Sequence, residues 1–170
     1  MHSAPSPTPA DAALAPPPLL DREALLTRAR QLQRAEAAAS TSALLRGKHL
    51  GLICEEASGD DARLFCSAAG ALGASVARIR PSMSELGSAS GSALLHTARV
   101  LGRLYDAIEC QGLAPALVQR LGRGAGVPVF DGLASPSHPS AALAALLDAS
   151  DPVEKRRLLI VQATLLFSLR

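Results

Sequence analysis

Most polar side chains that could bind a ligand or take part in catalysis lie in loops that follow short apolar runs. Ser58, Asp60 and Asp61 come after one such run, and Gln111 and His138 come after later ones. Backbone amides at a helix start bind anions, whereas grouped carboxylates make an acidic pocket for an uncharged or cationic molecule. An isolated histidine on a loop is more often structural or solvent-exposed than catalytic. The role of these groups therefore depends on the elements that position them.

Apolar periodicity predicts an alternation of helices and strands along the chain. Helical spacing covers Asp21–Ala38, Asp60–Leu72, Ala93–Leu104, Leu113–Leu121 and Ser140–Leu147. Short apolar runs predict strands at Lys48–Cys54, Ser75–Ile79, Tyr105–Cys110 and Val127–Phe130. This order is typical of an α/β three-layer sandwich, with a parallel sheet of about four strands and helices on both faces. Ligands of such sheets bind beyond the carboxyl ends of the strands, where the loops just named are expected.

The two ends of the chain have a different composition from its middle. Residues 1–18 hold six of the twelve prolines and are expected to form a disordered leader, followed by the main domain at 19–150. Arg156–Val161 (RRLLIV) predicts a strand and Ala163–Arg170 the start of a helix. Residues 151–170 are therefore interpreted as the beginning of a second α/β domain. Their apolar clusters need burial, so this edge is a candidate aggregation or partner surface.

Composition sets limits on the class of protein. The 170 residues are 48% hydrophobic with only four aromatic side chains, so Ala, Leu and Val must form the core. A formal net charge of +2 gives no reason to expect nucleic acid or an anionic membrane as a partner. Three widely spaced cysteines predict reduced thiols in a cytoplasmic protein rather than a metal site, and no cofactor is expected. No apolar stretch is long enough to span a membrane.

Several motifs resemble those of the ornithine carbamoyltransferases. They are Thr97–Asp106 (TARVLGRLYD), Gly126–Leu133 (GVPVFDGL) and the pair His138–Pro139, in the family's order. Leu45–Gly73 follows the family pattern of a strand, a phosphate loop and a helix. The resemblance covers about Leu20 to Ala149 and implies a Rossmann-like carbamoyl-phosphate-binding domain. Its family transfers a carbamoyl group from carbamoyl phosphate to ornithine, giving citrulline in arginine biosynthesis.

The phosphate loop departs most from the family pattern, which reads Ser-Thr-Arg-Thr-Arg. Helix amides and two arginines there bind the phosphate. Ser58 keeps the serine, and the next four positions are Gly59, Asp60, Asp61 and Ala62. Arg63 lies one position further, roughly 100° away around a helix. The carboxylates would repel phosphate, whereas an Asp at an N-cap satisfies helix amides and favours the dipole, so we interpret them as structural.

The other family ligand positions are altered too. Gln111 aligns with a family arginine, and Ala141 aligns with the glutamine of the His-Pro-x-Gln motif, whose histidine is His138. Glu85 replaces a glutamine in a loop that, in the family, reaches a neighbouring subunit's site. Tight binding of carbamoyl phosphate is therefore not expected, and His138 is interpreted as a remnant of the catalytic site.

Three functions follow from these observations. The first is an inactive carbamoyltransferase fold, kept for assembly as a homotrimer or with a full-length enzyme, or else a decaying remnant. The second is a working carbamoyltransferase component, active through Arg63 or through a partner chain that supplies the ornithine domain. The third is a binding module for an uncharged or cationic small molecule, with Asp60, Asp61 and Glu85 forming an acidic pocket.

Overall fold

A four-stranded parallel sheet forms the centre of the computed structural model, which describes residues 21–36, 44–55, 59–80 and 91–169. The strands are β1 (His49–Cys54), β2 (Ser75–Ile79), β3 (Ala107–Gln111) and β4 (Val129–Asp131). Their order is β2-β1-β3-β4, and every neighbouring pair is parallel. The predicted α/β class is confirmed: β2 has the predicted bounds, and the bounds of the other three strands differ from the prediction by one or two residues.

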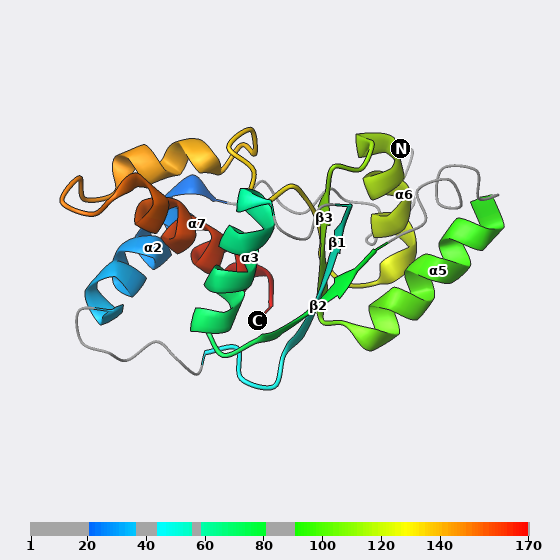
Figure 1. The fold of residues 1–170 in the computed structure, drawn as a ribbon. Coiled ribbons are helices and arrows are strands. Elements are labelled where there is room, and N and C mark those ends of the chain that lie inside the picture. The colour runs from blue at the N-terminus through cyan, green and yellow to red at the C-terminus, as the bar shows by residue number, and fades with distance from the viewer. Residues whose placement is uncertain (1–20, 37–43, 56–58, 81–90, 170) are drawn as a thin grey trace, which may run out of the picture.

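Helices cover both faces of the sheet and complete three layers (Figure 1). One face carries α2 (Arg22–Glu36), α3 (Asp60–Ala71), the 3-10 helix η1 (Ala141–Leu146) and α7 (Val153–Ser168). The other carries α5 (Gly91–Leu104) and α6 (Pro115–Ala125). Among the described helices, none is both long and apolar enough to cross a bilayer.

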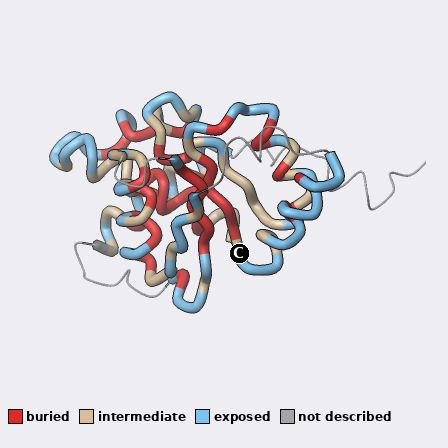
Figure 2. Tube along the Cα trace, turned by 45° about the vertical axis from the view of Figure 1, so that its right-hand side comes forward, coloured by how far each residue is buried: buried red, intermediate tan, exposed pale blue. Residues whose placement is uncertain are grey.

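The strands divide their side chains between two apolar clusters, and the buried part of the chain runs through the middle of the molecule (Figure 2). Leu50 and Leu52 of β1 face α2, α3 and α7, whereas Ile53 joins Ile108 and Cys110 on the α5–α6 side. This alternation follows from the two-residue period of a strand. The core is built largely of Ala and Leu, and its one fully buried aromatic side chain within the described residues is Phe65.

Helix α6 extends four residues beyond Leu121, where the predicted helix ends, and includes Gly122 and Gly124 before it ends at Ala125. The reason is close packing against α5. A Cβ added to Gly124 would lie 2.8 Å from the Cβ of Ala98, and one added to Gly102 would lie 1.7 Å from the carbonyl oxygen of Ala125. The interior glycines thus let two helices approach. Gly126, with φ of 71°, terminates the helix.

The strand predicted at Arg156–Val161 is wrong, because this segment lies inside α7. A short apolar run does not distinguish a strand from a buried helix by periodicity alone. The residues from Leu159 to Leu166 are all buried among α2, α3 and η1, because this largely apolar part of the helix is covered on every side. The expected exposed apolar edge is therefore also wrong. Assignment of residues 151–170 to a second domain stays a prediction, and residues 1–18 lie outside the described part.

Candidate functional site

A shallow hollow of about 400 Å³ lies at the carboxyl ends of β1 and β3. Parallel pairing places Cys54 beside Gln111, so both strands end at the same rim. The lining residues are Cys54, Glu55, Gly59, Asp60, Asp61, Ala62, Gln111 and Gly112. Five of these are predicted site residues: Gly59, Asp60, Asp61, Ala62 and Gln111. Arg63, His138 and Ala141 do not line the hollow, while Ser58 and Glu85 lie outside the described residues.

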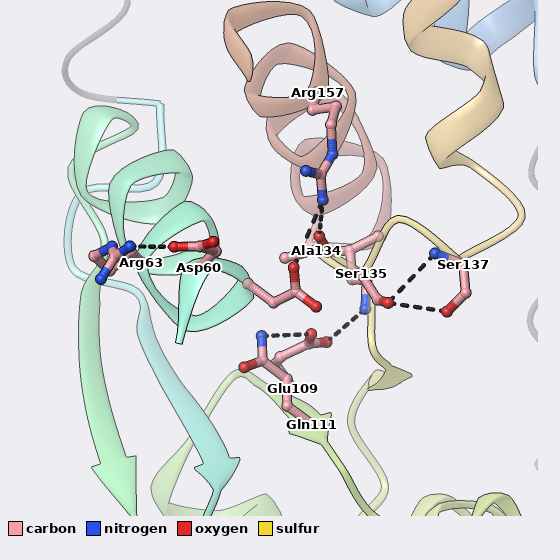
Figure 3. Close-up of polar contacts among 10 residues, drawn as sticks. Asp60, Arg63, Glu109, Gln111, Ala134, Ser135, Ser137 and Arg157 are labelled. Carbon is pink, nitrogen blue, oxygen red and sulfur yellow. Dashed lines mark hydrogen bonds and ion pairs between the residues drawn. The ribbon is translucent and has the colours of Figure 1, made fainter. Parts of the chain in front are cut away.

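The first turn of α3 differs from the predicted capping arrangement. Gly59 is the N-cap residue, and no side chain makes a cap hydrogen bond. Asp60 and Asp61 occupy the first helical positions, where their negative charges interact favourably with the helix dipole, although neither side chain caps the helix. Asp60 instead forms an ion pair with Arg63, one turn along (Figure 3). Both partners are largely exposed, so this pair contributes little to stability.

Asp61 contacts an arginine from a distant part of the chain. Its Oδ1 lies 3.7 Å from Nη2 of Arg157 on α7. The same Nη2 donates a 2.6 Å hydrogen bond to the carbonyl oxygen of Ala134, in the loop after β4 (Figure 3). Arg157 thus connects α7, the start of α3 and the loop that leads to His138. The sequence pattern did not indicate Arg157 as a site residue, because it lies within a segment predicted to be a strand.

Glu109 is a fully buried carboxylate on β3. Its Oε2 accepts the amide of Leu133 at 3.1 Å, and its Oε1 accepts Nε2 of Gln111 at 3.2 Å (Figure 3). Burial raises the pKa of Glu109 to about 8, although these hydrogen bonds oppose the rise. The sequence does carry a signal for this residue, because a carboxylate stands between Ile108 and Cys110 in a predicted strand.

His138 is half-buried in the loop between β4 and η1. Its Nδ1 lies 2.7 Å from Oγ of Ser140 and accepts the Ser140 amide at 3.2 Å. Burial lowers the pKa of His138, while the negative charge of Asp131 opposes that change. A neutral ring that accepts at Nδ1 carries its proton on Nε2. Ala141 donates its amide to the His138 carbonyl at 2.8 Å, and its methyl group has no hydrogen-bonding capacity.

The three cysteines are free thiols in the structure. Burial raises the pKa of Cys54 and, to about 12, that of Cys110, so both remain protonated near neutrality. Within the described ranges, no three His, Cys, Asp or Glu residues are grouped so as to hold a metal ion.

A second hollow of about 600 Å³ lies between α2 and the start of α7. Asp151 there accepts Gln33 at 2.6 Å and pairs with Lys155 at 2.9 Å. The site is larger, but it is remote from the carboxyl ends of the strands, where open parallel sheets bind ligands. The smaller hollow is therefore the better candidate.

Comparisons with known proteins match most of the chain, including the hollow, to one family. The family model for "Aspartate/ornithine carbamoyltransferase, carbamoyl-P binding domain" matches residues 20–150. An ornithine carbamoyltransferase of Actinobacillus pleuropneumoniae is 41% identical over 131 residues, which is 77% of this chain and 39% of that protein. One from Cutibacterium acnes is 40% identical over 127 residues, 75% of this chain and 37% of the relative. The chain thus spans about two fifths of these relatives' length.

The fold agrees with solved structures of such enzymes. Ornithine carbamoyltransferase from Pyrococcus furiosus superposes with a TM-score of 0.62 at 30% identity, covering 74% of this chain and 40% of that one. The Thermus thermophilus enzyme gives 0.60 at 27% identity, with 74% and 42% covered. Helix α7 begins beyond the residues that the family model matches.

Proposed function

Because the chain belongs to the aspartate/ornithine carbamoyltransferase family and comprises its carbamoyl-phosphate-binding domain, we propose that it has kept the fold and lost tight carbamoyl-phosphate binding. We further propose that it transfers no carbamoyl group by itself. The domain would then act as an assembly partner or persist as an inactive remnant.

One observation carries this proposal: two arginines near the start of α3 are paired with carboxylates of that helix. Arg63 pairs with Asp60, and Arg157 pairs with Asp61. A phosphate group would have to displace these carboxylates or be repelled by them. The helix end retains its uncapped amides and its dipole, but its own first turn supplies the negative charge.

The remaining family positions support the same conclusion. Gln111 donates its amide to Glu109, and Ala141 has no polar side-chain group to hold an amide. Each charge-assisted hydrogen bond that an arginine would make to phosphate is worth about 1.5–3 kcal/mol. Micromolar affinity corresponds to about 8 kcal/mol, so the replacement of three family arginines removes most of it.

Calorimetry with carbamoyl phosphate tests the loss of binding. We expect no dissociation constant below the millimolar range for the purified chain, with an intact ornithine carbamoyltransferase as the positive control. In the matched variant Asp60→Asn/Asp61→Asn, both arginines lose their paired charges, and affinity should rise. A micromolar dissociation constant for the unaltered chain would show that the proposal is wrong.

Catalysis and assembly require separate measurements. The family resemblance implies that ornithine is held mainly by a second domain, so we expect no citrulline from this chain with ornithine and carbamoyl phosphate. Citrulline formed only after a partner chain is added would instead support a carbamoyltransferase component. Gel filtration with light scattering, alone and with an intact ornithine carbamoyltransferase, tests for a homotrimer or mixed assembly. The roles in arginine biosynthesis and in the cytoplasm stay predictions.

A second candidate function rests on the acidity of the hollow. Glu55, Asp60 and Asp61 line it, and no lysine or arginine among the described residues does so. This lining favours a small cationic or uncharged molecule over an anion. Calorimetry with putrescine at low and high salt tests it: binding that weakens with salt supports the acidic pocket, and no binding at low salt removes it.

A further inference from the structure

Gln111 connects a buried carboxylate to the hollow. Gln111 is one of the residues that line the hollow, and its Nε2 donates to Oε1 of Glu109 at 3.2 Å. Glu109 itself is 0% exposed. The carboxamide of Gln111 therefore has one end directed toward Glu109, while the other end, Oε1, points away from it (Figure 3). A change at Glu109 can thus reach the lining of the hollow without moving the backbone.

The hydrogen-bonding capacity of Glu109 depends on its proton. An ionised carboxylate only accepts hydrogen bonds, whereas a protonated one also donates. Oε2 accepts the amide of Leu133, which leaves Oε1 as the oxygen that can carry the proton. A protonated Oε1 facing the NH2 group of Gln111 places two donors together. Rotation of the carboxamide by half a turn removes this conflict, since the terminal torsion of glutamine is soft and roughly two-fold.

We propose that Glu109 and Gln111 form a donor–acceptor switch, in which Gln111 presents its carbonyl oxygen to the hollow when Glu109 is ionised and its NH2 group when Glu109 is protonated. In the protonated state the hollow favours groups that accept hydrogen bonds, such as a carbonyl. In the ionised state it favours donors, such as an ammonium or amide NH2 group. Glu109 is thus a positioning residue for Gln111.

The charges around Glu109 favour a transition near neutral to mildly alkaline pH. Burial raises the pKa of Glu109 to about 8, and the negative charge of Asp131 on the next strand acts in the same direction. Cys110 on the same strand stays protonated, because its own pKa is raised to about 12. Beyond Ala134, Arg157 and Asp61 offset one another as an ion pair. Glu109 is therefore the group that titrates here.

The inference rests on the proposed function only in treating the hollow as the ligand-facing surface. The rotation of Gln111 requires no ligand. The switch and the loss of carbamoyl-phosphate binding can therefore fail independently of each other.

Nuclear magnetic resonance of the full chain with ¹⁵N labelling tests the switch. The NH2 protons of Gln111 should lose protection from solvent exchange as Glu109 becomes protonated, and gain it above the midpoint near pH 8. The exposed Gln119 on α6 gives the unprotected reference at each pH. A charge-assisted hydrogen bond should slow Gln111 exchange about tenfold relative to Gln119 at alkaline pH.

The variant Glu109→Gln separates the switch from a static hydrogen bond. Its amide keeps an acceptor for Leu133 and a permanent donor toward Gln111, so the fold is preserved and Gln111 is fixed in one orientation. We expect Gln111 in this variant to exchange like Gln119 at every pH. Two results would overturn the proposal. One is a ratio of the Gln111 to the Gln119 NH2 exchange rate that stays constant between pH 6 and 9.5 in the unaltered chain. The other is a ratio that still depends on pH in the Glu109→Gln variant.

Discussion

Replacing the buried Glu109 with glutamine should remove a large pH dependence of folding. The side chain is fully buried, and the donors to its carboxylate are neutral groups, the amide of Leu133 and Nε2 of Gln111. Desolvation therefore disfavours the ionised form in the folded protein. Glutamine has the same shape and is always neutral, so Glu109→Gln imitates the protonated state.

The size of the effect follows from the change in pKa. Folding raises the pKa of Glu109 from 4.5 to about 8. Between these values the folded protein holds a proton that the unfolded chain has released, so the stabilising contribution is complete below pH 4.5 and is lost as the pH rises to 8. At about 1.36 kcal/mol per pH unit, the total is about 5 kcal/mol. This is comparable to the whole stability of a small domain.

Urea unfolding measured at several pH values provides the assay. Between pH 5.5 and 8, the free energy of unfolding of the unaltered chain should fall by about 3 kcal/mol relative to that of Glu109→Gln. The comparison between the two proteins cancels the other titrating groups that they share. Glu154→Gln, an exposed change on α7, is the matched control and should leave the pH dependence as it is.

Two results would refute this reasoning. One is a pair of parallel stability curves for the unaltered chain and Glu109→Gln across pH 5.5 to 9. The other is a greater loss of stability from Glu109→Gln at pH 9 than at pH 5.5, since that would mean that the ionised carboxylate stabilises the fold. A directly measured pKa near 4.5 for Glu109 would locate the error in the desolvation argument.

Two further predictions concern packing. Leu165→Ala on α7 removes a fully buried side chain and should lower the free energy of unfolding by about 2–5 kcal/mol in urea titrations. The control Val153→Ala, at an exposed position of the same helix, should change the free energy of unfolding by less than about 0.5 kcal/mol. Equal effects of the two changes would contradict the burial of α7. Gly124→Ala places a Cβ 2.8 Å from that of Ala98 and should destabilise by about 1–3 kcal/mol, whereas Gly70→Ala meets no atom within 4 Å and should be neutral or stabilising. A neutral Gly124→Ala would show that α5 and α6 can separate.

Sequence patterns predicted the central layers well because those signals are local. The alternating apolar runs identified all four strands, and Ser75–Ile79 has the same bounds in both descriptions. The helix from Asp60 was predicted within one residue of α3. Residues around the phosphate loop and Gln111 were also expected at one edge of the sheet, and the hollow lies there. Parallel topology alone brings such loops together.

The errors arose where distant segments decide the outcome. Gly122 and Gly124 have turn-forming chemistry, but the proximity of α5 makes them part of a helix. Arg156–Val161 has the composition of a strand, yet it lies in a helix enclosed by α2, α3 and η1. No local pattern contains these neighbours, and tertiary packing overrides intrinsic propensity.

The sequence by itself determined the fold class, the family resemblance and the replacement of the phosphate-loop arginines by acidic residues. Only the tertiary structure decided how Asp61 is paired, because its partner Arg157 comes from a helix far along the chain. It also decided the state of Glu109, whose pKa depends on complete burial beneath the loop after β4. Residue types and their order are encoded locally, whereas desolvation and ion pairing depend on which distant atoms surround a charge.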